Sequence, residues 1–125
     1  MIIPIILTLI GFIFPHRWGE RKVDSFGGSV VGSSRHGRHQ QGFYDNGQNQ
    51  GFFPNGVHSD NPNGYKMTGS HRRDDIMSTA THGLDKDMGN YHVIGNNCKT
   101  YKKEANRRYD AIDYNMGQGY ANGRG

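Results

Sequence analysis

A helix signal that begins at the chain's cysteine constrains the fold more than any other feature of this sequence. Asn97 precedes it, and Asn is a favourable N-cap because its side-chain oxygen accepts a hydrogen bond from a free backbone N–H of the first helical turn. From Cys98 onward, apolar side chains recur at spacings of three and four, the pattern of a helix with one buried face. We therefore predict a helix capped by Asn97 whose inward-facing residues are Cys98, Tyr101, Ala105, Tyr109 and Ile112.

Cys98 is the only cysteine among the 125 residues, and its position at the helix start suits a reactive thiol. The thiolate is the nucleophilic form, and a helix N-terminus stabilises it through unpaired N–H groups and a partial positive charge. We predict that the pKa of Cys98 is lowered and that Cys98 is catalytic, with a nearby histidine as its base. The alternative interpretation is a small core residue.

The composition limits the size of the fold and the kinds of site that it can hold. Hydrophobic residues make up 33% of the chain and glycine occupies 19 positions, so the core must be small and rich in aromatic residues. One cysteine excludes an internal disulfide. The seven histidines lack the i, i+4 spacing that places two on one helix face. We predict one small domain with neither a metal nor a cofactor.

The net charge of +4 and the sequence pI of about 9.3 suit an anionic partner such as nucleic acid, a cell-wall polymer or a membrane surface. The basic residues are scattered through the chain, so a solvated surface explains them equally well.

Residues 1–14 are almost entirely apolar, and a basic flank follows them as far as residue 22. We interpret residues 1–22 as an export or anchor segment, with a buried strand or the remnant of a longer parent as alternatives, and predict a secreted or membrane-associated protein. Residues 23–34 read as a Gly/Ser linker.

Two aromatic pairs, each followed by a turn signal, dominate the middle of the chain: GFYDNG at 42–47 and GFFPNG at 51–56. Asn-Gly and Pro-Asn-Gly favour tight turns, so we predict a strand meander here, with further strands at 65–68 and 91–94. A weaker helix is predicted within 70–83, a loop at 84–90 and a disordered tail at 115–125. The predicted fold class is α+β: a small antiparallel sheet or meander packed on one Cys-bearing helix, with Gly-rich flexible ends and the domain at 35–114.

Three motifs together carry a resemblance to a known family: GFYDNG, GFFPNGVHSD and YHVIGNNCKTY, the last of which opens the helix. Their succession over residues 35–112 resembles the permuted papain-like domains related to NlpC-type cell-wall hydrolases. Similar domains form the C-terminal toxin domains of bacterial RHS and other polymorphic toxins. The most specific part is Asn96-Asn97-Cys98 followed by an amphipathic helix with Tyr101.

This resemblance implies a cysteine-dependent hydrolase or acyltransferase that acts on an amide or ester bond, as a bacterial toxin or effector. Cys98 would attack the carbonyl, and backbone N–H groups at the Asn97-capped helix start would stabilise the oxyanion. The partners would be a peptide, peptidoglycan or lipid acyl substrate and an immunity-type inhibitor protein. The candidates for the base are His39, then His36, then His58, and those for the residue that orients it are Asp60, Asn55 and Gln41.

Two other classes of function compete with the hydrolase. A small basic nuclease would use a histidine as base and would depend on residues other than Cys98. Its candidates are His58, Asp60, His71, His82 and Asp85. A non-catalytic Gly/Tyr-rich binding module is the third interpretation, and its Cys98 thiol would have ordinary reactivity.

Overall fold

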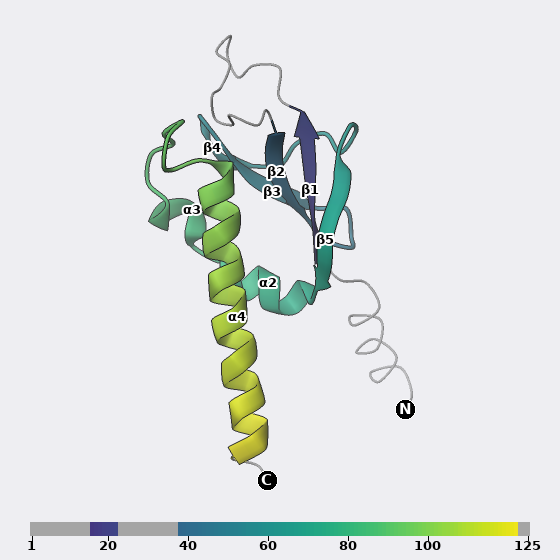
Figure 1. Ribbon diagram of the computed structural model, residues 1–125, viewed down its shortest axis with the longest axis vertical. Helices are drawn as coiled ribbons and strands as arrows, with labels where there is room; N and C mark the ends of the chain where they lie inside the picture. Colours follow the sequence, from purple (N-terminus) through teal and green to yellow (C-terminus); the bar gives the residue numbers. More distant parts are fainter. Residues whose placement is uncertain (1–15, 23–37, 123–125) are drawn as a thin grey trace.

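The computed structural model describes residues 16–22 and 38–122, which form one antiparallel sheet with helices packed on it (Figure 1). The sheet has five strands in the order β4-β3-β2-β1-β5. The helix that carries Cys98 lies against it, so the predicted α+β class is confirmed. The predicted N-terminal segment at 1–14 and the predicted linker at 23–34 lie outside the described residues. No helix within the described part of the chain is long and apolar enough to cross a membrane.

The predicted meander forms the middle of the sheet. Its strands are β2 (Arg38–Phe43), β3 (Asn49–Phe53) and β4 (Gly56–His58), each antiparallel to its neighbour. The Asp-Asn-Gly turn joins β2 to β3, and Gly47 in that turn has a φ of 92°, a conformation that favours glycine. The second turn signal joins β3 to β4 through a shorter turn at residues 54–55, after which Gly56 has a φ of 119°.

Strand β1 (His16–Lys22) corrects the predicted domain boundary at residue 35. It pairs with β2 on one side and with β5 (Lys66–Arg72) on the other, so the predicted basic flank is part of the sheet. The boundary was misplaced because β1 has only one large apolar side chain, Trp18, which is 3% exposed. Its neighbours are mostly charged, so the alternation of apolar and polar side chains that marks a strand is hardly visible. One apolar residue in seven is too weak a period-two signal to predict a strand.

The helices are α2 (Asp74–Thr81), α3 (Leu84–Asp87) and α4 (Cys98–Asn122). Helix α2 confirms the predicted helix within 70–83, and its predicted apolar stripe is buried. The predicted loop at 84–90 contains α3 instead, because Leu84 is buried in the core. The predicted strand at 91–94 is wrong: a tight turn held by an isolated bridge between His92 and Asn96 occupies this segment. The predicted disordered tail is wrong up to Asn122, because α4 continues through it.

The start of α4 has the predicted cap. Asn97 Oδ1 accepts from the backbone N–H of Lys99 at 2.9 Å and from that of Thr100 at 3.4 Å. The inward phase is also confirmed, because Cys98, Tyr101, Ala105 and Tyr109 are buried and Ile112 packs against the core. The helix start and the set of inward-facing residues were therefore predictable from local sequence.

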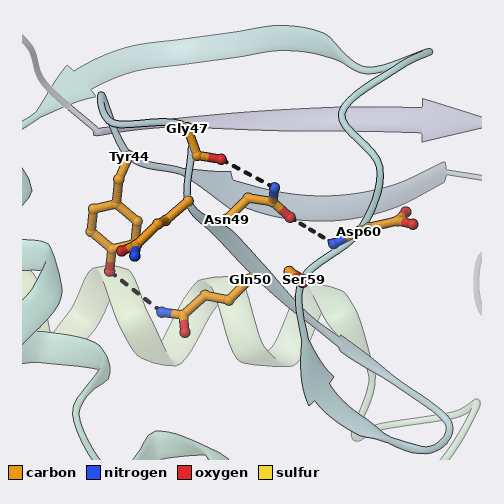
Figure 2. Close-up of a pocket in the computed structure, with 7 residues that line it drawn as sticks. Tyr44, Gly47, Asn49, Gln50, Ser59 and Asp60 are labelled. Carbon is orange, nitrogen blue, oxygen red and sulfur yellow. Dashed lines mark hydrogen bonds between the residues drawn. The ribbon is translucent and has the colours of Figure 1, made fainter.

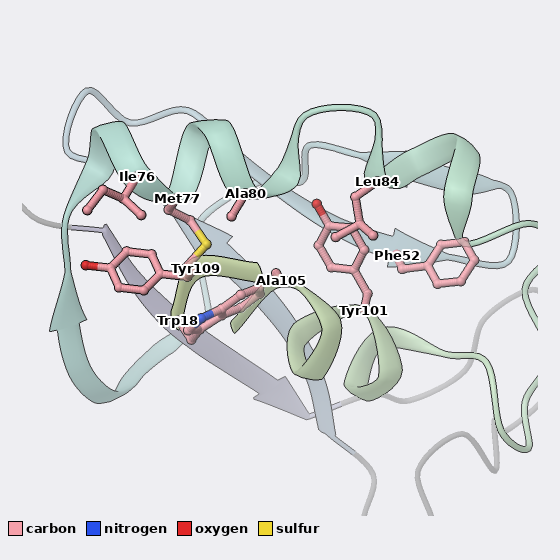
Figure 3. Packing of buried hydrophobic residues seen from close by; sticks show 9 residues of the cluster. All are labelled: Trp18, Phe52, Ile76, Met77, Ala80, Leu84, Tyr101, Ala105 and Tyr109. Carbon is pink, nitrogen blue, oxygen red and sulfur yellow. The ribbon is translucent and has the colours of Figure 1, made fainter. Parts of the chain in front are cut away.

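The apolar core lies between the sheet and the helices (Figure 3). Trp18 and Phe52 come from the sheet, and Tyr101 of α4 packs near both, with ring centroids 6.4 Å and 6.3 Å away. The remaining core residues come from the helices: Ile76, Met77, Ala80, Leu84, Ala105 and Tyr109. Helices α2 and α4 cover one face of the sheet, which we call the helix face. The connection at 59–65 runs between the two edge strands and crosses the opposite face, which we call the open face.

Replacement of Leu84, which is 0% exposed, tests this core. We expect Leu84→Ala to lower the free energy of unfolding in urea by about 2–5 kcal/mol, through lost burial and a residual cavity. The matched control is Ile94→Ala, since Ile94 is 90% exposed, and its change should stay within about 0.5 kcal/mol. Equal effects of the two substitutions would contradict the described packing.

Candidate functional site

Cys98 lies at the start of α4 with its thiol against strand β2. Its Sγ is 4.0 Å from the carbonyl oxygen of Arg38, and the side chain is only 1% exposed. A buried thiol of this kind is inaccessible to a substrate in the described conformation.

The pKa of Cys98 is raised, so the predicted lowering is wrong. Burial, which disfavours the charged thiolate, is the largest cause. Hydrogen bonding from the backbone N–H of Gln40 opposes it, as do the charge of Lys99 and the first N–H groups of the helix. The helix start does favour the thiolate as predicted, but desolvation outweighs it.

His39, the predicted base, points to the other face of the sheet. Its ring lies 4.2 Å from that of Phe53, and its Nε2 is 2.7 Å from Gln41 Oε1. Gln40, the next residue, faces α4 and accepts a hydrogen bond from Lys102 Nζ at 3.2 Å. Because side chains alternate along a strand, β2 presents Gln40 rather than His39 to the helix that carries Cys98. The structure does not bring Cys98 and His39 together, and His36 lies outside the described residues.

Burial also dominates the ionisation of the two buried histidines. It lowers the pKa of His39 to about 4. It lowers the pKa of His16 to about 3, with the charge of Arg72 as a second cause. His16 lies on the helix face between the rings of Trp18 and Tyr44, at 5.1 Å and 4.9 Å, away from the start of α4. Both histidines are therefore neutral at physiological pH.

The predicted nuclease residues are brought together only in part. His58, at the end of β4, stacks on Phe53 at 4.2 Å, and Asp60 follows it in the crossing connection. The other three lie elsewhere: His71 in β5 at the opposite sheet edge, His82 at the end of α2 and Asp85 in α3. Among residues 16–22 and 38–122, no group of three or more His, Cys, Asp or Glu is placed to hold a metal ion.

Asp60, predicted as an orienting residue, is the centre of a polar cluster on the open face. Its Oδ2 accepts from Arg21 Nη2 and from the Tyr65 hydroxyl, both at 2.7 Å. Burial alone would raise the pKa of Asp60, but the hydrogen bonds from Tyr65, from the Asn61 backbone and from Arg21 lower it. The carboxylate is thus ionised and already paired.

A chain of side-chain amides continues from this cluster. Gln41, which is 0% exposed, donates from Nε2 to Asn49 Oδ1 at 2.7 Å and to the His58 carbonyl at 3.2 Å. The same Asn49 oxygen accepts from the backbone N–H of Asp60 at 2.8 Å. His39, Gln41, Asn49 and Asp60 are therefore connected by consecutive hydrogen bonds.

A pocket of about 500 Å³ opens beside this chain of amides (Figure 2). We call it the amide pocket, because three of its seven lining residues carry side-chain amides. None of the lining residues is a lysine, arginine or histidine, and the one carboxylate is the paired one of Asp60. The lining residues are Tyr44, Gly47, Gln48, Asn49, Gln50, Ser59 and Asp60.

Sequence reasoning named Gln41 and Asp60 but missed Asn49 and Gln50, which follow the first turn. The turn signal that predicted the hairpin also places both at the first positions of β3, on opposite faces of the sheet. Arg21 was missed because β1 has no strand signal in the sequence, whereas Tyr65 lies in the predicted strand at 65–68 but was not named as a site residue.

No protein-family model matches this chain, and neither does any curated protein or any solved structure. The resemblance to papain-like toxin domains stays a prediction.

The two buried histidines predict a specific pH dependence of stability. Each has a pKa below the ordinary 6.5 in the folded state, at about 4 and about 3. The unfolded chain therefore binds more protons than the folded one below pH 6.5, and stability falls as pH falls through this window. We expect the free energy of unfolding in urea to decrease from pH 7 to pH 5, approaching about 1.4 kcal/mol per pH unit for each histidine. His39→Gln should reduce the slope of stability against pH by the contribution of one histidine, about 1.4 kcal/mol per pH unit. A free energy of unfolding that does not change with pH would contradict the burial of both rings.

Proposed function

We propose that this chain is a non-catalytic binding module that takes a small, neutral, polar ligand in the amide pocket. The observation that carries the proposal is the chemistry of the lining: amide, hydroxyl and backbone groups, one carboxylate that is already paired, and no cation. The pocket volume lies within the range of about 300–1,000 Å³ that is usual for small-molecule sites, and the lining is more polar than is usual for them.

Charge supports a neutral ligand over an ionic one. An anion would be repelled by the Asp60 carboxylate. Because the lining has no cation, no attraction would offset the free energy of removing the anion from water. A cation would compete for a carboxylate that Arg21 and Tyr65 already occupy. A neutral group that forms hydrogen bonds with the amides is neither repelled by Asp60 nor in competition with Arg21 and Tyr65.

A thiol hydrolase is the second candidate, and one observation favours it. The backbone N–H groups of Gln40, Cys98 and Lys99 and the charge of Lys99 all favour the thiolate form of Cys98 and oppose the rise of its pKa. Such donors would stabilise a thiolate or an oxyanion once the thiol became accessible. Burial of Cys98 and the orientation of His39 weigh against it.

Ligand binding tests the first proposal. We expect neutral disaccharides, but neither inorganic phosphate nor putrescine, to shift the backbone amide resonances of residues 44–50 and 59–60 in titrations followed by NMR. Gln50→Ala should weaken that binding about tenfold, a loss of about 1.4 kcal/mol, because Gln50 lines the pocket. The matched control is Asn115→Ala, an exposed amide on α4, which should leave the affinity unchanged. Shifts confined to other residues would contradict the proposal.

Alkylation of Cys98 distinguishes the two candidates. For the binding module we expect the rate of iodoacetamide reaction to rise with a midpoint above the value of about 8.5 for a free thiol, because burial raises the pKa of Cys98. His39→Ala should not move this midpoint. A midpoint well below the free-thiol value, shifted upward in His39→Ala, would favour the hydrolase.

A further inference from the structure

We propose that one end of this protein binds the surface of a bilayer that contains anionic lipids, and that the turn between α3 and α4 inserts apolar side chains into it. The amide pocket lies beside the turn from β2 to β3, at the other end of those strands, so the two sites are separate. Three features of this end support the proposal: exposed aliphatic side chains, a backbone paired within the protein, and lysines without carboxylate partners.

The turn between α3 and α4 exposes two adjacent aliphatic side chains. Ile94 is 90% exposed and Val93 is 40% exposed. The described residues expose large apolar side chains at two other positions, Tyr114 and Met116, and both lie in the second half of α4. Removal of an aliphatic side chain from water is favourable, so the tip of this turn gains free energy by entering an apolar phase.

Several backbone groups of this turn are paired within the protein. His92 and Asn96 exchange two backbone hydrogen bonds, at 2.8 Å and 3.3 Å. The carbonyl of Val93 accepts from Asn97 Nδ2 at 2.9 Å, and that of Gly95 accepts from a side-chain hydroxyl in the first turn of α4 at 3.2 Å. An unpaired backbone group resists transfer out of water, so this pairing lowers the cost of inserting the tip into a bilayer.

The turn lies at the end of the sheet where β1 finishes and β2 starts (Figure 1). Lys22 ends β1 and pairs in register with Arg38, the first residue of β2. On the other side of β1, Lys66 begins β5 opposite Glu20. Helix α4 starts at the same end, because Cys98 Sγ lies 4.0 Å from the carbonyl oxygen of Arg38. Strand ends, helix start and turn therefore form one surface.

Cations dominate this surface. In the part of the chain that the structure describes, its lysines form no ion pair. The carboxylates of β1, β2, β5 and the first two turns of α4 are Glu20 and Glu104, and both have arginine partners. We call the surface, with the turn, the basic end, and its cations are Lys22, Arg38, Lys66, Lys99 and Lys103.

An aliphatic tip among cations fits a bilayer better than other anionic partners. A nucleic acid would use the cations but not the tip, because bases stack on aromatic side chains and not on aliphatic ones. A stable protein interface usually buries about 800 Å² on each partner, far more than two side chains at a turn provide. A bilayer needs no complementary shape: its acyl region takes up the tip and its anionic headgroups attract the cations.

Ile94→Ser tests the apolar tip, because Ile94 is too exposed for its loss to disturb the core. We measure sedimentation of the full chain with vesicles of phosphatidylcholine and phosphatidylglycerol in equal parts. The unaltered protein should bind, and Ile94→Ser should bind about tenfold more weakly, a loss of about 1.4 kcal/mol. The matched control is Met116→Ser, which removes an exposed apolar side chain from the second half of α4 and should leave the affinity unchanged. No binding of the unaltered protein, or equal losses in the two variants, would overturn the proposal.

The two ends of β5 supply a matched test of the cations. Lys66→Gln removes a cation from the basic end, whereas Arg73→Gln removes one just beyond the opposite end of the strand. We expect Lys66→Gln to weaken binding to the same vesicles about fivefold and Arg73→Gln to leave it unchanged. Vesicles of phosphatidylcholine alone should bind the unaltered protein at least about tenfold more weakly. Equal effects of the two substitutions would overturn the role of the basic end.

The position of the unaltered protein on the bilayer gives a second readout. Spin-labelled lipid in bicelles of the same composition should broaden the backbone amide resonances of residues 92–96 more than those of residues 113–117. Broadening confined to other residues would overturn the proposal even if vesicles sediment the protein. Binding of a DNA duplex that Lys66→Gln weakens and Ile94→Ser leaves unchanged, without binding to vesicles, would instead assign the basic end to nucleic acid.

Discussion

The burial of Tyr101 between helix α4 and the sheet is the contact on which the rest of the structure depends. Its ring packs near Trp18 of β1 and Phe52 of β3, and so joins two strands that are distant in the sequence to the last helix. The same contact sets the rotation of α4 and therefore turns Cys98, one helical turn earlier, against the backbone of β2. The thiol is buried because the helix packs well, and this is why a favourable helix start does not produce a reactive cysteine.

The two faces of the sheet are stabilised in different ways. Aromatic and aliphatic side chains of the helices cover the helix face. The crossing connection at 59–65 covers the open face and is held there by hydrogen bonds and the Arg21–Asp60 ion pair. Polar groups that are buried must be paired, and on the open face the hydrogen bonds to the His58 carbonyl and the Asp60 N–H fix the directions of the Gln41 and Asn49 amides. A pocket bordered by such groups is preorganised for hydrogen bonding, which lowers the entropic cost of binding.

Local signals in the sequence predicted the local structure well. The Asn97 cap, the inward stripe of α4, the two turns of the meander and the apolar stripe of α2 needed only neighbouring residues. The failures were non-local: β1 is recognisable only from its partners in the sheet, and the segment at 91–94 folds into a turn although its apolar residues favour a strand. The pairing of Cys98 with His39 was wrong for a similar reason, since alternation along β2 placed Gln40, not His39, toward the helix.

Gly51 shows how a residue without a side chain supports the chain of amides on the open face. It lies opposite Gln41 across the β2–β3 pair, and a Cβ at this position would collide with the Gln41 amide oxygen. Any larger residue would displace Gln41 and with it the hydrogen bond from Gln41 Nε2 to Asn49 Oδ1. A substitution at this buried glycine should therefore disturb the shape of the pocket more than a substitution at an exposed lining residue such as Gln48.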